Sequence, residues 1–369
     1  MIYFDVSKNW TVLVVKKELS DQGASRDLVR CIGELRRSVN LPPTEPPLVN
    51  GTQETPDEGS PIILLNSDGV DPYRDGFSWR AGDQRIELYG NSDRALEKGI
   101  YDFLSALGFR WPNVQTEHAP PRPEGDTRYP LSKDGNYKAD SPDLGSLARV
   151  FFNLEDLGKR GVEWIHWAAR NQFDAPVVTA ENATPSAAKL RNFLFQHDRR
   201  FAEAIESHRF PIEIGGVFLS SLVPRSLFFR NPDLFRMVQG RRRNDRNFCP
   251  TNPTTLKIIR ENAKKLFDGY LEVRIFHLWA DGALENDAPQ SWCSCPTCRA
   301  FSPDEQALMG LNIAADALAD SRSDAWLSYI ACENGVEAIK PRPNTFPVQP
   351  RDKGWYFITP LPAVPPGPS

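Results

Sequence analysis

Carboxylic acids gather in one loop of the sequence, directly after an apolar segment that is expected to form a strand. Asp281 follows the run 273–280 and precedes Gly282, and Glu285 and Asp287 lie a few residues further on. At the carboxyl end of a barrel strand, carboxyl groups can act in general acid–base catalysis. We therefore expect Asp281, and after it Glu285, to be catalytic. The alternatives are a turn-forming aspartate in an Asp-Gly pair and solvated loop acids.

Four further side chains near predicted strand ends are candidates for binding a substrate. His277 and Trp279 are two residues apart in one expected strand, so both side chains lie on one face of it. An imidazole there can bind a ligand hydroxyl, and the indoles of Trp279 and Trp292 can stack on a ligand face. A hydrogen-bonded core histidine and core tryptophans are the alternatives. Asn252 closes the polar segment 248–252, although its place before Pro253 favours helix capping.

Three cysteines lie together and have the character of metal ligands. Cys293, Cys295 and Cys298 form a C-x-C-x-x-C pattern. Thiolates this close can bind zinc, with Cys249 or His277 as the fourth ligand. The paired C-x-x-C knuckles of common zinc domains are absent, so a structural thiol cluster or a labile disulfide is the alternative.

The composition excludes several classes of protein. The 369 residues carry 44 Lys and Arg against 48 Asp and Glu, a net charge of -4, which is not the basic excess of a nucleic-acid-binding protein. The longest apolar run, Trp10 to Val15, is too short to cross a bilayer. The first residues contain no secretory signal, so the sequence leaves the cellular location open.

The elements that must position these residues belong to the α/β class. We expect strands at 10–15 and 61–66, a hairpin around 81–83, and helices at 23–38 and 93–107. From about residue 148, five strand–helix units alternate, which predicts a parallel sheet. A closed eight-unit barrel takes about 250 residues, and the proline-rich end of the chain from residue 340 cannot supply the three units that are missing. The predicted domains are residues 1–125, a linker at 126–144, a partial (β/α) TIM-type barrel at 145–350 and a tail at 351–369.

Several segments carry a resemblance to known families. Residues 86–112, IELYGNSDRALEKGIYDFLSALGFRWP, resemble the small N-terminal domain that precedes the barrel in α-glucuronidases and β-hexosaminidases. Five later segments, taken in order, resemble the bacterial family of domain of unknown function 4838, of which some members are endo-β-N-acetylglucosaminidases. These segments are 231–241 (NPDLFRMVQGR), 249–253 (CPTNP), 276–282 (FHLWADG), 292–298 (WCSCPTC) and 302–306 (SPDEQ).

The resemblance implies a barrel glycoside hydrolase that acts on β-linked N-acetylglucosamine in glycans. Such enzymes use the acetamido oxygen of the substrate as the nucleophile and need no cofactor. One protonated carboxyl then donates its proton to the leaving oxygen, and a second carboxylate orients the acetamido group. Asp281 and Glu285 are the residues to which these roles would fall. The expected partner is a glycan, with no nucleic acid and no membrane, and the relatives are mostly exported.

Departures from the family pattern support two alternatives. Val217 stands where a histidine is expected, and the chain ends before the strand that would bring a further glutamate. The first alternative is therefore a non-catalytic homologue, truncated at its C-terminus, that binds carbohydrate or has no activity. The second is a zinc-stabilised interaction module built on the cysteine cluster.

Overall fold

The computed structural model describes residues 2–15, 23–50, 60–66, 73, 75–132, 136–137, 144–153, 160–179, 199–282, 291–330, 338–348 and 355–357. The chain forms two compact units whose segments alternate along the sequence. Unit 1 consists of residues 1–142, 160–174 and 200–211, and unit 2 consists of residues 143–159, 175–199 and 212–369. None of the helices in the described ranges is both long and apolar enough to span a membrane.

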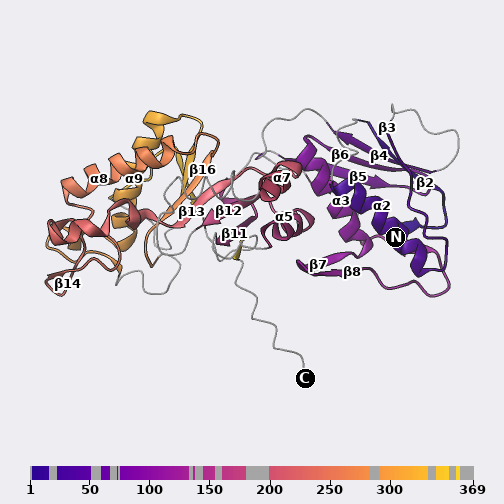
Figure 1. The fold of residues 1–369 in the computed structure, drawn as a ribbon, viewed down its shortest axis with the longest axis horizontal. Helices are drawn as coiled ribbons and strands as arrows, with labels where there is room; N and C mark the ends of the chain where they lie inside the picture. Colours follow the sequence, from indigo (N-terminus) through magenta and orange to yellow (C-terminus); the bar gives the residue numbers. More distant parts are fainter. Residues whose placement is uncertain are drawn as a thin grey trace, which may run out of the picture. The chain divides into compact units, whose positions relative to one another are not determined.

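Unit 1 contains a six-stranded mixed sheet with the strand order β10-β5-β6-β4-β2-β3 (Figure 1). The predicted strands and the predicted hairpin are confirmed, whereas β3 lies in a segment predicted as a loop. Two small antiparallel pairs, β1 with β9 and β7 with β8, complete the strands described for this unit. The strands are β1 Tyr3–Asp5, β2 Trp10–Val14, β3 Leu48–Asn50, β4 Ser60–Asn66, β5 Phe77–Ala81, β6 Ile86–Gly90, β7 Arg110–Asn113, β8 Thr116–His118, β9 Arg128–Pro130 and β10 Asn136–Tyr137.

Four helices lie in the described part of unit 1, and one of them packs on the central sheet. Helix α3 (Asp93–Leu107) packs against β6, β5 and β4, and α2 (Gly23–Ser38) packs against α3. The Ser92 hydroxyl accepts a hydrogen bond from the Ala95 amide at the start of α3, and Gly108 ends the helix at a φ of 107°. The other two helices are α5 (Gly161–Arg170) and α7 (Arg199–Ser207).

Unit 2 is built on a seven-stranded parallel sheet with the order β18-β17-β16-β13-β12-β11-β19. The proline-rich end supplies two strands in the described residues, β18 and β19, which is fewer than the three further units that a closed barrel would need. Pro347 fits in β18 because this strand lies at one end of the strand order, where one side makes no ladder bonds. The strands are β11 Arg149–Asn153, β12 Ala175–Thr179, β13 Glu213–Val217, β16 Ile275–Trp279, β17 Trp326–Ile330, β18 Thr345–Val348 and β19 Trp355–Phe357.

The parallel sheet curls strongly. In a flat sheet, five strand spacings of about 4.8 Å would separate β11 from β18 by about 24 Å. The guanidinium of Arg149 in β11 instead lies 5.6 Å from the ring of Phe346 in β18. The face that carries these two side chains is therefore concave. Strands in chain order on a curled sheet form a partial α/β barrel, and the described strands include no β18–β19 pair that would close it.

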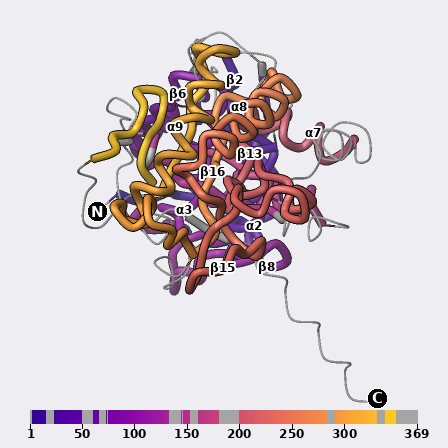
Figure 2. Tube along the Cα trace, turned by 90° about the vertical axis from the view of Figure 1, so that its left-hand side faces the viewer, coloured from indigo at the N-terminus to yellow at the C-terminus, as the bar shows by residue number. Residues whose placement is uncertain are grey.

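Two long helices of unit 2 run side by side, as Figures 1 and 2 both show. They are α8 (Pro253–Asp268), which follows β13, and α9 (Pro303–Ser321), which follows β16. Ser302 and Glu305 form a capping box at the start of α9. The short elements described for unit 2 are η1 Leu144–Ser146, η3 Leu219–Leu222, η4 Arg225–Phe229, η5 Pro232–Leu234, β14 Met237–Val238, β15 Arg241–Arg242 and η7 Cys298–Ala300.

Candidate functional site

A fully buried polar network crosses the concave face of the parallel sheet. The Arg149 guanidinium in β11 donates from Nε to Glu213 Oε2 at 2.5 Å and from Nη2 to Oε1 at 3.2 Å. His277 Nε2 lies 2.8 Å from Glu213 Oε2, and His277 Nδ1 lies 2.6 Å from the Ser328 hydroxyl. All four side chains are fully buried. Four strands are thus joined through one carboxylate and one imidazole.

The charges of this network are set by burial and by its partners. Burial raises the pKa of Glu213, but the positive charge of Arg149 and the hydrogen bonds from His277 and Arg149 bring the pKa below its usual value. Burial lowers the pKa of His277 more than the contact with Glu213 raises it. The result is a neutral imidazole between a carboxylate and a hydroxyl, beside a paired guanidinium.

The two predicted binding residues of β16 lie inside this packed face. Trp279 donates its indole N–H to the Ser328 hydroxyl at 3.0 Å. The Phe151 ring packs at 5.8 Å from the His277 ring and 5.5 Å from the Trp279 ring. Both side chains are buried, so in this structure their polar atoms bind protein. His277 is thus in the environment of a hydrogen-bonded core histidine.

Asp281 lies just beyond the carboxyl end of β16 and is held at its backbone. The amide side chain of Asn247 donates to the Asp281 carbonyl at 2.9 Å and accepts from the Asp281 N–H at 3.0 Å. The Asp281 side chain is 24% exposed, and its Oδ2 lies 3.4 Å from Nη2 of Arg225. Gly282 follows at a φ of 82°, so the Asp-Gly turn is present as well. The carboxylate is therefore both fixed in place and open to solvent.

Arg225 in η4 is a candidate binding residue that the sequence does not reveal. Burial lowers the pKa of Arg225, and the charge of Asp281 only partly opposes this shift. Its Nη1 atom is buried and has no hydrogen-bond partner among the described residues. An unpaired buried donor is costly, so an oxygen atom of a ligand would be stabilised there. The segment around Arg225 has no periodicity or motif that would have indicated it.

The remaining predicted residues fall in different places. Trp292 is buried against the Phe248 ring at 5.7 Å, and with Trp279 it lines a cavity of about 70 Å³. Ligand pockets typically measure about 300–1,000 Å³, so this cavity is too small for a sugar. Asn252 caps α8, accepting from the Thr254 and Thr255 amides. Glu285 lies outside the described residues, as does Asp287.

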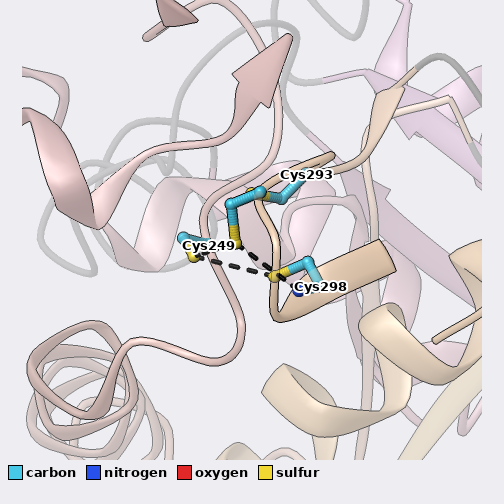
Figure 3. A group of neighbouring side chains, drawn as sticks. Cys249, Cys293 and Cys298 are labelled. Atoms are coloured by element: carbon cyan, nitrogen blue, oxygen red, sulfur yellow. Dashed lines mark hydrogen bonds between the residues drawn. The ribbon is translucent and has the colours of Figure 1, made fainter. Parts of the chain in front are cut away.

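Four buried cysteines form a compact cluster near this edge of unit 2. Cys249 precedes α8, and Cys293, Cys295 and Cys298 precede α9. All four sulfurs lie within 4.8 Å of one another. Figure 3 shows the side chains of Cys249, Cys293 and Cys298 pointing toward a common centre. The predicted trio thus gains Cys249 as a neighbour, whereas His277 takes part in the concave-face network.

Two members of the concave-face network could have been suspected from the sequence. Glu213 is a single acid inside an apolar strand, and Arg149 directly precedes the apolar run 150–152. Buried charges of opposite sign tend to pair. Their pairing reaches across β12, however, so it depends on the order of the strands in the sheet.

No protein-family model matches the sequence, and no curated protein matches it. The chain is similar to the chitobiase of Flavobacterium johnsoniae, with a TM-score of 0.46 and 14% identity over 89% of this chain and 50% of that one. It is similar to the GH20 exo-β-N-acetylglucosaminidase of Vibrio harveyi, with a TM-score of 0.42 and 12% identity over 90% and 55%. It is also similar to the GH20 β-N-acetylhexosaminidase of Streptomyces coelicolor, with a TM-score of 0.44 and 11% identity over 91% of this chain and 68% of that one. The chain spans about half the length of the first two proteins.

Proposed function

We propose that unit 2 binds glycans containing β-linked N-acetylglucosamine and hydrolyses them with the help of the substrate's acetamido group. Asp281 is the carboxylate of this proposal. The observation that carries it is the placement of a backbone-clamped, solvent-accessible carboxylate at the carboxyl end of a strand in a curled parallel sheet. The resemblance of residues 231–306 to the family of domain of unknown function 4838 supplies the substrate class.

In the proposed reaction, the acetamido oxygen attacks the anomeric carbon while the bond to the leaving oxygen breaks. The Asp281 carboxylate accepts a hydrogen bond from the acetamido N–H and balances the positive charge of the ring that forms. Glu285 gives its proton to the leaving oxygen, and then takes a proton from the water that opens the ring. The product keeps the β configuration, and both carboxyl groups return to their starting states.

Arg225 supports a sugar site at this edge. Its Nη2 group faces the Asp281 carboxylate, while Nη1 has no partner in the described structure. A sugar hydroxyl beside Asp281 would thus meet the Nη2 side of the guanidinium. Arg225 is therefore the positioning residue that we assign to the substrate.

The direct test is hydrolysis of a chromogenic chitobioside by the purified full chain. We expect Asp281→Asn to lower kcat/KM by at least about 100-fold, because the amide cannot balance the charge of the intermediate. Asp320→Asn is the matched control, since Asp320 lies on the exposed face of α9 in an ion pair with Arg260. Equal activity of Asp281→Asn and wild type would remove Asp281 from the mechanism.

One observation favours binding without catalysis. Val217 ends β13 with 42% of its surface exposed, at the position where the sequence pattern leads us to expect a histidine. A chain that binds chitobiose but never cleaves it would support this second function. In that case Asp281→Asn should weaken binding, and there would be no turnover to lose.

A further inference from the structure

We propose that Cys249, Cys293, Cys295 and Cys298 bind one zinc ion, and that this ion holds the loop that clamps Asp281. The four cysteines come from two loops of unit 2 that are more than forty residues apart in the sequence. Their side chains are all buried, and all are free thiols. The zinc site does not depend on the proposed function, whereas its effect on hydrolysis does.

The spacing of the sulfurs fits a single tetrahedral ion. A Zn–S bond of about 2.3 Å places the sulfurs of a regular tetrahedron about 3.8 Å apart. Cys249 Sγ lies 3.9 Å from Cys295 Sγ and 3.7 Å from Cys298 Sγ. Every other pair in the cluster is within 4.8 Å. The two Cys249 separations match those of a regular tetrahedron, and the others are short enough for one ion to be shared by the four sulfurs.

Hydrogen-bond donors surround the sulfurs in the way that a thiolate needs. The Met237 N–H donates to Cys293 Sγ at 3.3 Å, and the Cys298 N–H donates to Cys295 Sγ at 3.5 Å. Arg242 Nη1 lies 3.8 Å from Cys293 Sγ and brings a positive charge. Four thiolates around Zn²⁺ carry a net charge of about −2, which such outer partners stabilise.

The chemistry of the donor set favours zinc. A closed, buried set of four thiolates is the typical coordination of a structural zinc ion, and among the common metals iron is the competitor. Among the residues that the structure describes, no carboxylate or imidazole belongs to the cluster, so the four sulfurs suit zinc better than hard cations such as magnesium and calcium. The site has no open coordination position, which gives the ion a structural rather than a catalytic part.

The ion would fix the loop that carries the Asp281 clamp. Asn247 lies two residues before Cys249, and Ser291 lies two residues before Cys293. The Asn247 amide donates to the Ser291 carbonyl at 3.1 Å as well as to the Asp281 carbonyl. A metal that joins Cys249 to Cys293 would therefore hold Asn247 beside Ser291, and so keep the Asn247 side chain in place to bind Asp281. Loss of the ion should loosen the Asp281 backbone.

The first experiment is metal analysis of the purified full chain by plasma mass spectrometry. We expect one zinc ion per chain, and less than a fifth of that in Cys298→Ser. Cys31→Ser is the matched control, because Cys31 is also buried but lies in α2 of unit 1, away from the cluster. It should keep the full zinc content. Zinc lost equally from both variants, or one equivalent of iron in place of zinc, would overturn the proposal.

A second measurement does not require the variants to fold. Replacement of zinc by cobalt in the wild-type chain should give the intense visible bands of a tetrahedral cobalt thiolate complex. The four cluster thiols should react with a thiol reagent only after chelation of the metal. Four thiols that react at full rate without a chelator, or that are oxidised to disulfides in the chain as purified, would contradict a zinc site.

The proposed effect of the zinc ion on Asp281 is tested by measuring hydrolysis with and without the metal. Chelation under reducing conditions should lower kcat/KM on the chitobioside at least tenfold, with recovery when zinc is restored. Zinc bound in full to an inactive wild-type chain would contradict the proposed function and leave the metal site standing. An active chain that keeps its activity after zinc removal would contradict only the role of the ion in holding Asp281.

Discussion

At the scale of single residues, the concave face combines a packed polar interior with a carboxylate at its rim. Glu213 binds both Arg149 and His277, so the two buried charges of this network, on Arg149 and Glu213, are paired with each other. Asp281 differs because its backbone is fixed while its side chain meets solvent. Candidate catalytic groups need this combination, since a fixed position lowers the cost of orienting a substrate and exposure lets the substrate reach it.

The buried imidazole predicts how stability depends on pH. Because the pKa of His277 is lower in the folded than in the unfolded chain, its contribution is present above the unfolded-state pKa of about 6.5 and is lost as the pH falls. We expect the urea midpoint to fall between pH 7 and pH 5. In His277→Gln this fall should be shallower, whereas in His118→Gln, a change at an exposed position of unit 1, it should match wild type. Equal slopes in wild type and His277→Gln would contradict the assignment.

The carboxylate of the same network adds a second, more acidic step. The pKa of Glu213 is lowered in the folded chain, so its contribution is present above the unfolded-state pKa of about 4.3 and is lost as the pH falls further. Acid unfolding of unit 2 is therefore expected to begin with the imidazole and to be completed as Glu213 becomes protonated. These residues could be singled out from the sequence as polar groups in apolar strands, but their pairing depends on the order of the strands in the sheet.

At the scale of elements, most of the strands and helices follow from local patterns. Apolar runs in the sequence predict β2, β4, β12 and β16. The spacing of apolar side chains predicts α3, α8 and α9. The patterns fail for β3, β18 and β19, which are three or four residues long. Elements this short contain too few residues to show a period, and the prolines in the segments around them favour a loop. Long-range pairing within the sheet decides them.

The middle of β13 contains a glycine that cannot be replaced without strain. Gly215 has a φ of 128°, and a Cβ atom there would lie 1.9 Å from the His277 carbonyl oxygen. We expect Gly215→Ala to lower the free energy of unfolding by more than about 3 kcal/mol. Gly240→Ala is the control, because Gly240 also has a positive φ but has no atom within 4 Å; its cost should be about 1–2 kcal/mol. Urea titration that gives equal losses would show that the close approach does not matter.

Asn252 lies at the start of α8, and two variants can distinguish its role as a helix cap from a role in substrate binding. Its Oδ1 accepts from two helix amides, and its Nδ2 donates to the Asp233 carbonyl. Asn252→Ala should lower the free energy of unfolding by about 1 kcal/mol, and Asn252→Asp, which keeps the cap, should lower it less. KM for the chitobioside should stay the same in both variants. A raised KM with unchanged stability would instead make Asn252 a substrate-binding residue.

At the scale of the whole molecule, the curled parallel sheet of unit 2 agrees with the partial barrel that the sequence predicts. Alternating strands and helices predict the parallel sheet, and the contact of Arg149 with Phe346 across five strand spacings shows its curvature. The cysteine cluster is predicted only in part. Its C-x-C-x-x-C part is visible in the sequence, whereas the choice of Cys249 rather than His277 as the fourth member depends on how two distant loops meet.

The account as a whole depends on a site that recognises the intermediate of acetamido-assisted hydrolysis. A thiazoline derived from N-acetylglucosamine mimics the ring that closes on the anomeric carbon. A site built for that intermediate should bind the mimic at least about 100-fold more tightly than N-acetylglucosamine itself. Asp281 should supply most of the difference.

Isothermal titration calorimetry of the zinc-loaded full chain with both ligands is therefore the measurement that we would choose. The account predicts the large preference for the thiazoline in the wild type and in Asp320→Asn, and its loss in Asp281→Asn. Equal affinities for the two ligands in the wild type, or a preference that persists in Asp281→Asn, would contradict it.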